Sequence, residues 1–213
     1  MFAEHYAKHY DLLNKNKPYR HEVEFIYLWA QRPKRILDLG CGTANYWNFF
    51  PSGVLINGIE KSIDMRKLSR YTRAIILGDI CKMDYGQLYP YDLAMALFDV
   101  VNYAPNLSWI EKLPVKRGGF FIFDILEKKK DEKFERTERS MGNLKRIIQP
   151  RPQIKNKVTL DIFLESDSGT EKETHDLFLW TEKDIKKAAG TAFDIVETKE
   201  TESWQKWYKL RKK

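Results

Sequence analysis

The first 125 residues alternate between short apolar runs and stretches with helical periodicity. The apolar runs are rich in β-branched and aromatic residues, which favour strands. We predict strands at ILDL (36–39), VLINGIE (54–60), AIILGD (74–79), YDLAMALF (91–98) and FFIFDI (120–125). Such alternation is typical of βαβ units, and near-continuous apolar strands are typical of a parallel sheet that is buried on both faces. The pattern therefore predicts an α/β fold with helices on both faces of the sheet.

The residues before the first strand are predicted to form two helices, at 3–14 and 20–31. The second helix places Ile26 and Ala30 at helical spacing, and Pro33 follows as a stop signal. We expect these helices to form a cap in front of the sheet.

Beyond residue 125 apolar and polar positions alternate one by one. VTLDIFLES (158–166) and ETHDLFLW (173–180) flank the turn signal DSGT, which predicts a half-exposed hairpin. A short helix should follow, because Thr181 is a good N-cap with Asp184 three residues on and Gly190 at the far end. This part of the chain therefore differs in kind from the parallel sheet.

No linker, repeat or low-complexity segment separates these parts. We predict a single domain over residues 1–213, with an N-terminal helical cap over about residues 1–33 and an inserted β lid over about residues 135–180. Two late strands, FDIVET and WQKWYKL, are predicted to complete the sheet.

The composition and the order of residues bear on whether the protein has a full core, a signal peptide, a membrane span or a metal site. With 43% apolar and 14% aromatic residues, a chain of 213 residues can bury a full core. The start, MFAEHYAKHY, lacks the pattern of a signal peptide, and no apolar run approaches the ~18 residues that span a bilayer. We therefore expect a cytoplasmic protein. Cys41 and Cys81 show no CxxC spacing, so no metal site is predicted.

The net charge of +7 comes from 37 Lys and Arg against 30 Asp and Glu. The basic residues alternate with acids, as in EKKKDEKFERTER (127–139). A mixed run of this kind is usually a solvated face and not a track for nucleic acid. The charge pattern therefore favours a small-molecule substrate.

Carboxylates stand at the ends of four predicted strands: Asp38, Glu60, Asp79 and Asp124. In open α/β sheets, ligands bind in the crevice outside the carboxyl ends of the strands. We therefore expect the binding site at this edge.

The loop ILDLGCGTAN (36–45) indicates which ligand is bound there. A dinucleotide site of the nicotinamide type needs a third glycine, where this chain has Asn45. Asp38 would also lie beside the diphosphate, where its negative charge is unfavourable. S-adenosylmethionine removes both objections, because it is a phosphate-free adenosine ligand with an α-ammonium and a sulfonium. Asp38, Gly40, Gly42 and Glu60 can supply the acceptors it needs.

From about residue 35 to the end, the chain resembles the class I S-adenosylmethionine-dependent methyltransferases, whose sheet is Rossmann-like. DLGCGTA looks like the first motif of that family, although Ala44 stands where many members have a third glycine. GIEKSIDM, GDI, ALFDVVNY and KRGGFFIFDI resemble the family's later segments, in order and at the right intervals.

This resemblance implies a cofactor site. Glu60 would take the two ribose hydroxyls and Asp79 the adenine amine, with Ile80 packing on the ring. The other cofactor residues that the resemblance implies are Asp38, Gly40, Cys41, Gly42, Lys61, Leu97, Phe98 and Tyr19.

The substrate class follows from what the chain lacks and from a closer resemblance. LFDVVNY has no DPPY-like tetrapeptide for adenine amines, and no Pro-Cys dipeptide exists for cytosine methylation. YDLLNKNKPY, RTERS and ETHDLFLWTEKDI resemble a subgroup with a β lid, which includes sugar N,N-dimethyltransferases and glycine- and sarcosine N-methyltransferase-like proteins. The resemblance implies an amine acceptor. The missing motifs and the mixed charge pattern argue against a nucleic acid partner, and we expect no membrane partner and a monomer or homodimer. The resemblance also implies that Tyr10, Asn102 and His175 contact the substrate.

His175 is also the candidate catalytic base. An amine must lose a proton before it attacks a methyl group, and an imidazole, with an ordinary pKa around 6.5, suits that work. Alternation places His175 on the same strand face as Leu177 and Leu179. A core histidine with satisfied ring nitrogens is therefore the alternative, just as simple aromatic packing is the alternative for Tyr10 and Tyr19.

Two other functions stay open at this point. An RNA methyltransferase would use the net charge and stack bases on exposed Trp204, Trp207 and Tyr208 near the basic end LRKK, although SWQKWYKL also fits an edge strand with one packed face. A non-catalytic binding partner would keep the fold with a damaged cofactor site, whereas Asp38, Glu60 and Asp79 are all present.

Overall fold

The computed structural model describes residues 4–127, 134–200 and 205–213. Its body is a seven-stranded sheet in the order β10-β11-β5-β4-β1-β2-β3. Strand β11 runs antiparallel to both of its neighbours, β5 and β10. The strands are β1 (Arg35–Leu39), β2 (Leu55–Glu60), β3 (Ile75–Leu77), β4 (Tyr91–Ala96), β5 (Val115–Leu126), β10 (Phe193–Glu200) and β11 (Gln205–Lys212). The strands β1 to β5 are parallel, so the predicted α/β fold is confirmed.

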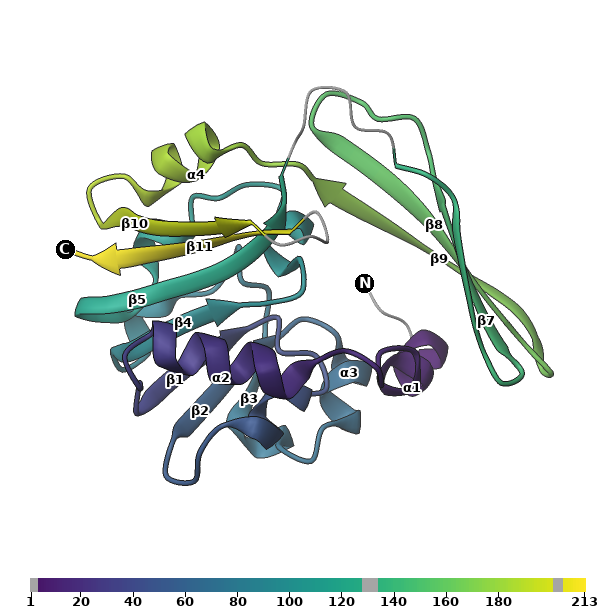
Figure 1. Cartoon of the computed structure of the whole chain (residues 1–213), viewed down its shortest axis with the longest axis horizontal. Coiled ribbons are helices and arrows are strands. Elements are labelled where there is room, and N and C mark those ends of the chain that lie inside the picture. Colours follow the sequence, from purple (N-terminus) through teal and green to yellow (C-terminus); the bar gives the residue numbers. More distant parts are fainter. Residues whose placement is uncertain (1–3, 128–133, 201–204) are drawn as a thin grey trace.

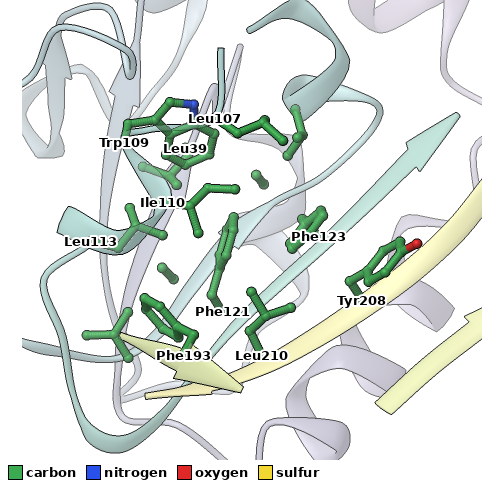
Figure 2. Close-up of a cluster of buried hydrophobic side chains, with 14 of the residues drawn as sticks. Leu39, Leu107, Trp109, Ile110, Leu113, Phe121, Phe123, Phe193, Tyr208 and Leu210 are labelled. Atoms are coloured by element: carbon green, nitrogen blue, oxygen red, sulfur yellow. The ribbon is translucent and has the colours of Figure 1, made fainter. Parts of the chain in front are cut away.

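Helices and short 3-10 turns cover both faces of this sheet, as predicted. The helices are α1 (Glu4–Leu13), α2 (Tyr19–Trp29), α3 (Ile63–Leu68) and α4 (Glu182–Ala189), and the turns that matter below are η1 (Asn45–Phe49), η4 (Val100–Tyr103) and η5 (Ile110–Lys112). One face packs under α2 and η1, and the other packs under α4 and η5. Figure 2 shows the apolar cluster on the face that α4 and η5 cover, with Phe121 and Phe123 of β5 at its centre.

The predicted cap of α4 is confirmed. The Thr181 side chain accepts a hydrogen bond from the backbone N–H of Asp184 at 3.3 Å, and the Asp184 carboxylate accepts one from the backbone N–H of Thr181 at 2.9 Å. This reciprocal capping box satisfies two N–H groups that the first turn of a helix leaves without partners.

A second, antiparallel sheet of four strands forms what we call the lid sheet, in the order β6-β7-β8-β9. Its strands are β6 (Thr137–Met141), β7 (Leu144–Pro150), β8 (Lys157–Ser166) and β9 (Gly169–Phe178). Tyr6 and Leu13 of α1 pack with Leu144, Ile162 and Leu164 of this sheet in a small apolar cluster. Figure 1 shows the lid sheet projecting from the body on the side where α1 lies.

Several boundaries differ from the predicted ones. Leu97 and Phe98 fall outside β4, because the chain leaves the sheet after Ala96 and Phe98 takes a left-handed backbone with φ of 66°. The strand β5 begins at Val115 and so is longer than its apolar run. The hairpin of β6 and β7 was not predicted, because four of the five residues of β6 are exposed and lack the alternation that marks a half-buried strand.

The structure contradicts the prediction that Trp207 and Tyr208 are exposed aromatic residues on which an RNA methyltransferase could stack bases. Trp207 is 5% exposed and Tyr208 is 0% exposed, because β11 is an inner strand between β10 and β5 and both of its faces are covered. The prediction of an edge strand with one packed face was therefore also wrong. Trp204 lies outside the described residues.

Within the part of the chain that the structure describes, no helix is both long and apolar enough to cross a membrane. The same residues contain no group of three or more His, Cys, Asp or Glu side chains that could hold a metal ion.

Candidate active site

The glycine loop follows β1 at the carboxyl edge of the sheet. Gly40 and Gly42 have φ of 64° and 57°, which is left-handed backbone that residues with a Cβ rarely adopt. A Cβ on Gly40 would lie 2.7 Å from both methyl carbons of Val100, in η4. The N–H groups of Gly40 and Cys41 donate to the carbonyl oxygen of Ile59, at 2.7 and 3.2 Å. The loop is thus fixed between β2 and the segment that follows β4.

Glu60 ends β2 and reaches back to this loop. Its carboxylate accepts hydrogen bonds from the backbone N–H groups of Gly42 at 2.8 Å and of Ser62 at 2.7 Å. Burial raises the pKa of Glu60, and the donated N–H groups oppose that rise. A carboxylate has about four lone-pair sites, so Glu60 can still accept from a ligand diol.

Asp38 is buried at the end of β1, with 2% of its surface exposed. The indole N–H of Trp47 donates to its carboxylate at 2.7 Å. Burial raises the pKa of Asp38 to about 7, the nearby charge of Glu60 adds to the rise, and the Trp47 hydrogen bond opposes it. A ligand cation beside Asp38 would favour its ionised form, because an opposite charge nearby lowers the pKa of a carboxyl group.

Asp79 lies next along the edge, after β3. Its carboxylate accepts from the backbone N–H of Cys81 at 3.0 Å and pairs with the Lys61 ammonium at 2.9 Å. Partial burial would raise the pKa of Asp79, but these partners outweigh it and hold the pKa below its usual value. Ile80 is half-buried beside it and packs against the core.

A cleft with about 340 Å³ of empty space, part of it open to solvent, runs along the glycine loop. It is lined by Tyr10, Tyr19, Asp38, Gly40, Cys41, Gly42, Thr43, Asn45, Tyr46, Leu97 and Phe98. Eight of the predicted site residues are in this lining. Glu60 adjoins it through Gly42, whereas Lys61, Asp79, Ile80, Asn102 and His175 are not among the lining residues.

Comparison with solved structures adds to this geometry. DesVI of Streptomyces venezuelae superposes with a TM-score of 0.79 at 16% identity, over 100% of both chains. SAM-bound CalS10 of Micromonospora echinaspora, an amino pentose methyltransferase involved in calicheamicin biosynthesis, gives 0.73 at 16% identity, over 100% of this chain and 98% of that one. The sugar N-methyltransferase KedS8 of Streptoalloteichus sp ATCC 53650 gives 0.74 at 16% identity, over 96% and 93%.

The chain has a Rossmann-like methyltransferase fold. No protein-family description and no curated protein matches the sequence. At this level of identity the likeness concerns the fold.

The methyltransferase fold is tied to its N-terminal helix through residues that sequence reasoning missed. Asp11 of α1 accepts hydrogen bonds from the Thr43 hydroxyl at 2.6 Å and the Asn45 amide at 2.7 Å. Asp11 is 32 residues from Thr43. No local pattern marks such a pair, so only the fold reveals it.

Lys17 is a second residue that was missed. Its ammonium pairs with Glu22 at 2.7 Å and lies 4.5 Å from the centre of the Phe98 ring. The rings of Tyr46 and Tyr19 are 5.7 and 5.9 Å away. A largely buried cation thus lies against three of the rings that line the cleft, as cation–π attraction favours.

The segment after β4 is strained where it borders the cleft. Phe98 and Asp99 have consecutive left-handed backbones, with φ of 66° and 62°. Asp124, at the end of β5, accepts from both of their N–H groups, at 2.7 and 3.1 Å, and Gln205 donates to Asp124 at 3.0 Å. Burial and the charge of Asp99 hold the pKa of Asp124 well above its usual value. Such strain is kept at functional sites, where it fixes a side chain against a ligand.

Asn102 and His175 lie behind this segment. The Asn102 amide donates to the carbonyl oxygens of Leu126 at 3.1 Å and Phe178 at 2.8 Å, and so ties η4 to β5 and to the lid sheet. His175 is buried, with Nδ1 3.2 Å from the Tyr103 hydroxyl and Nε2 2.8 Å from Glu173. Their predicted substrate contacts stay predictions.

Proposed function

We propose that the protein is an S-adenosylmethionine-dependent methyltransferase that acts on the amine nitrogen of a small molecule. The observation that carries the proposal is the buried Glu60 carboxylate, anchored on the glycine loop beside Asp38. Two acids at the ends of β1 and β2 suit a ligand that combines a cation with a ribose diol.

The same contact argues against a diphosphate ligand. In phosphate-binding loops the backbone N–H groups point at the ligand's phosphates. Here the N–H of Gly42 donates to Glu60, and the N–H of Gly40 donates to the carbonyl oxygen of Ile59. The loop therefore offers carboxylates where a dinucleotide needs donors.

The residues present fit the proposed cofactor, which supplies an activated methyl group when bound. Asp38 would hold its ammonium, Glu60 its ribose diol, and Asp79 with Ile80 its adenine. Lys17 is the cation placed to meet its carboxylate, and Leu97, Phe98 and Tyr19 are the apolar walls. These assignments rest on the cleft lining, on the order of the acids along the sheet edge and, for Lys17, on its contacts with the lining rings.

The acceptor is proposed to be an amine on a small molecule such as an amino sugar. The printed descriptions of CalS10 and KedS8 name an amino pentose methyltransferase and a sugar N-methyltransferase, which supports this class. Asp38, Glu60 and Asp79 are all present, which argues against a non-catalytic partner with a damaged site. The cytoplasmic location and the oligomeric state stay predictions.

The experiment that tests the proposal uses S-adenosylmethionine with an isotopically labelled methyl group. The protein is incubated with panels of amino sugars, amino acids, their hydroxyl counterparts and RNA. We expect label on an amine of the small-molecule panel together with an equal amount of demethylated cofactor. Label found on RNA, or on no acceptor while the cofactor binds, would contradict the proposed reaction.

Nucleic acids are expected to bind weakly. Binding of transfer RNA, ribosomal RNA fragments or DNA should fall steeply between about 50 and 200 mM salt, because only dispersed charges can neutralise phosphates. Fluorescence anisotropy at several salt concentrations measures this. Binding that resists salt and depends on sequence would revive the RNA methyltransferase.

Cofactor affinity is expected to rise with pH up to about 7 and then level off. The free protein holds a proton on Asp38 below its pKa of about 7, whereas the ligand's ammonium requires the carboxylate. Each pH unit below the free-state pKa should therefore cost up to about tenfold in affinity, with release of one proton on binding. Calorimetry in buffers of different ionisation enthalpy counts that proton.

The variant Asp38→Asn should remove this pH dependence. Asp194→Asn is the matched control, because Asp194 is an exposed acid on β10 paired with Lys213 at 3.0 Å. A pH dependence that survives in Asp38→Asn would assign the proton to another group.

A further inference from the structure

A row of aromatic rings extends from the cleft to His175 on β9 of the lid sheet. Phe98 and Tyr10 line the cleft with ring centres 6.4 Å apart, Tyr6 follows 6.5 Å from Tyr10, and the His175 ring lies 6.2 Å from Tyr6. Tyr103, the last residue of η4, approaches the same imidazole from the body, with ring centres 5.6 Å apart. These five rings come from α1, from the segment after β4 and from β9, and together they form a continuous set of ring contacts that begins at the cleft.

Within this row the hydrogen bonds form a directed chain. Glu173 and His175 share one face of β9, and the Glu173 carboxylate lies 2.8 Å from His175 Nε2. A carboxylate only accepts, so the ring proton is on Nε2 and Nδ1 carries the lone pair. The Tyr103 hydroxyl, 3.2 Å from Nδ1, then donates to it. The arrangement resembles a catalytic triad, in which a carboxylate orients an imidazole and the imidazole activates a hydroxyl.

Exposure separates the roles of Tyr103 and His175. The His175 side chain has an exposed fraction of 0%, and both of its ring nitrogens face protein side chains. Tyr103 keeps 39% of its surface exposed and stands at the carboxyl edge of the sheet, on the segment that also provides Phe98. An acceptor in this region can reach Tyr103 and cannot reach the imidazole directly.

We propose that Tyr103 is the catalytic residue that takes the proton of the acceptor amine, and that His175 and Glu173 are positioning residues that act through it. This inference rests on the proposed methyl transfer and assigns the residues that prepare its acceptor.

The proton balance is simple. The N–H bond of the acceptor's ammonium breaks, and its proton goes to the Tyr103 oxygen while the proton of Tyr103 goes to His175 Nδ1. The imidazolium that forms is stabilised by the Glu173 carboxylate. The acceptor nitrogen is left with the lone pair that methyl transfer consumes, and the relay returns its proton to water after the product leaves.

The surrounding charges favour a cationic acceptor. Tyr103 faces Asp99 from its own segment, Glu173 from β9, Tyr6 from α1 and Arg146 from β7. The Arg146 guanidinium donates to the Tyr6 hydroxyl at 3.3 Å and is the positive charge set against the two acids. Two acids near one phenol attract a protonated amine more than a neutral alcohol.

The first test measures which nitrogen of the His175 ring carries the proton and requires no catalytic turnover. Nitrogen-15 NMR of the imidazole in the protein alone should show His175 with its proton on Nε2 and a hydrogen-bonded Nδ1. Tyr103→Phe should change the Nδ1 shift and keep the tautomer. A proton found on Nδ1, or an Nδ1 shift that ignores Tyr103→Phe, would overturn the chain of hydrogen bonds.

The second test is kinetic. Tyr103→Phe should lower kcat by roughly 10² or more, leave KM within a few-fold, and remove the acidic limb of the pH profile of kcat. His175→Ala should have an equal effect, and the double variant should be no slower than either, because the residues act as a unit. Glu173→Gln is the substitute if His175→Ala does not fold. Tyr89→Phe, at an exposed tyrosine of 75% accessibility ahead of β4, is the matched control.

The outcomes separate this inference from the proposed function. Calorimetry with the demethylated cofactor should give affinities within a few-fold for all variants. If the unaltered protein binds no cofactor, the proposed function fails, whatever the NMR result. If it binds and turns over, yet Tyr103→Phe keeps kcat within threefold or its effect adds to that of His175→Ala, the relay is wrong and the function stands.

Discussion

Glu60→Ala is expected to lower the affinity for S-adenosylmethionine, and for its demethylated product, at least tenfold. The carboxylate would accept two charge-assisted hydrogen bonds from the ribose, each worth about 1.5 to 3 kcal/mol before compensation. The substitution also leaves the N–H groups of Gly42 and Ser62 without their acceptor, so the loop loses its anchor. Isothermal titration calorimetry with both nucleosides measures the loss.

Glu165→Ala is the matched control for this change. Glu165 lies on β8 with a 43% exposed side chain, and its loss removes the same charge without touching the loop. Circular dichroism establishes that each variant is folded before titration. An affinity of Glu60→Ala equal to that of the unaltered protein would contradict the cofactor site.

Gly40→Ala is expected to be the most destabilising single change in the loop. The new Cβ would lie 2.7 Å from two Val100 methyl carbons, and overpacking of this kind costs about 1 to 3 kcal/mol. The left-handed φ of 64° adds about 1 to 2 kcal/mol. Denaturant titration should show the sum as a lower free energy of unfolding, and cofactor binding should fall with it.

A second-site change separates these two causes. Val100→Ala removes the methyl carbons that the new Cβ meets, so Gly40→Ala with Val100→Ala should cost less than the two single changes added together. Gly142→Ala is the matched control, because Gly142 has φ of 63° and nothing within 4 Å of its Cβ position. A Gly142→Ala cost equal to that of Gly40→Ala would mean that the clash contributes nothing.

The cofactor edge could be predicted from the sequence because its residues follow consecutive strands. In a parallel sheet the carboxyl ends meet at one edge, so chain order alone brings Asp38, Glu60 and Asp79 to the same side. The glycines could be predicted for a similar reason, since their backbone conformation is a local property.

The contacts between distant segments could not be predicted in this way. Asp11 meets Thr43, and Lys17 meets Phe98, only because α1 and α2 fold across the sheet edge. His175 illustrates the same limit, because alternation gave its strand face and could not show that Glu173 and Tyr103 would occupy both ring nitrogens.

The polar strand β6 and the buried strand β11 were also difficult to predict from the sequence. The strand β6 carries no apolar stripe, because four of its five residues are exposed and neither of its faces is buried. Trp207 and Tyr208 lie between Lys206 and Lys209, so this segment resembles a half-exposed strand. In the fold Lys209 lies 4.4 Å from the centre of the Phe120 ring and 5.7 Å from that of Trp29, so even a lysine of β11 is covered.

The central claim is that the cleft beside Glu60 holds S-adenosylmethionine, and a crystal structure of the protein with the demethylated cofactor tests it most directly. We expect the ribose diol on the Glu60 carboxylate, the ammonium on Asp38 and the adenine beside Asp79 and Ile80. Its sulfur should face the Tyr103 side of the cleft. A nucleoside bound elsewhere, or a cleft that stays closed to it at saturating concentration, would contradict this cofactor site.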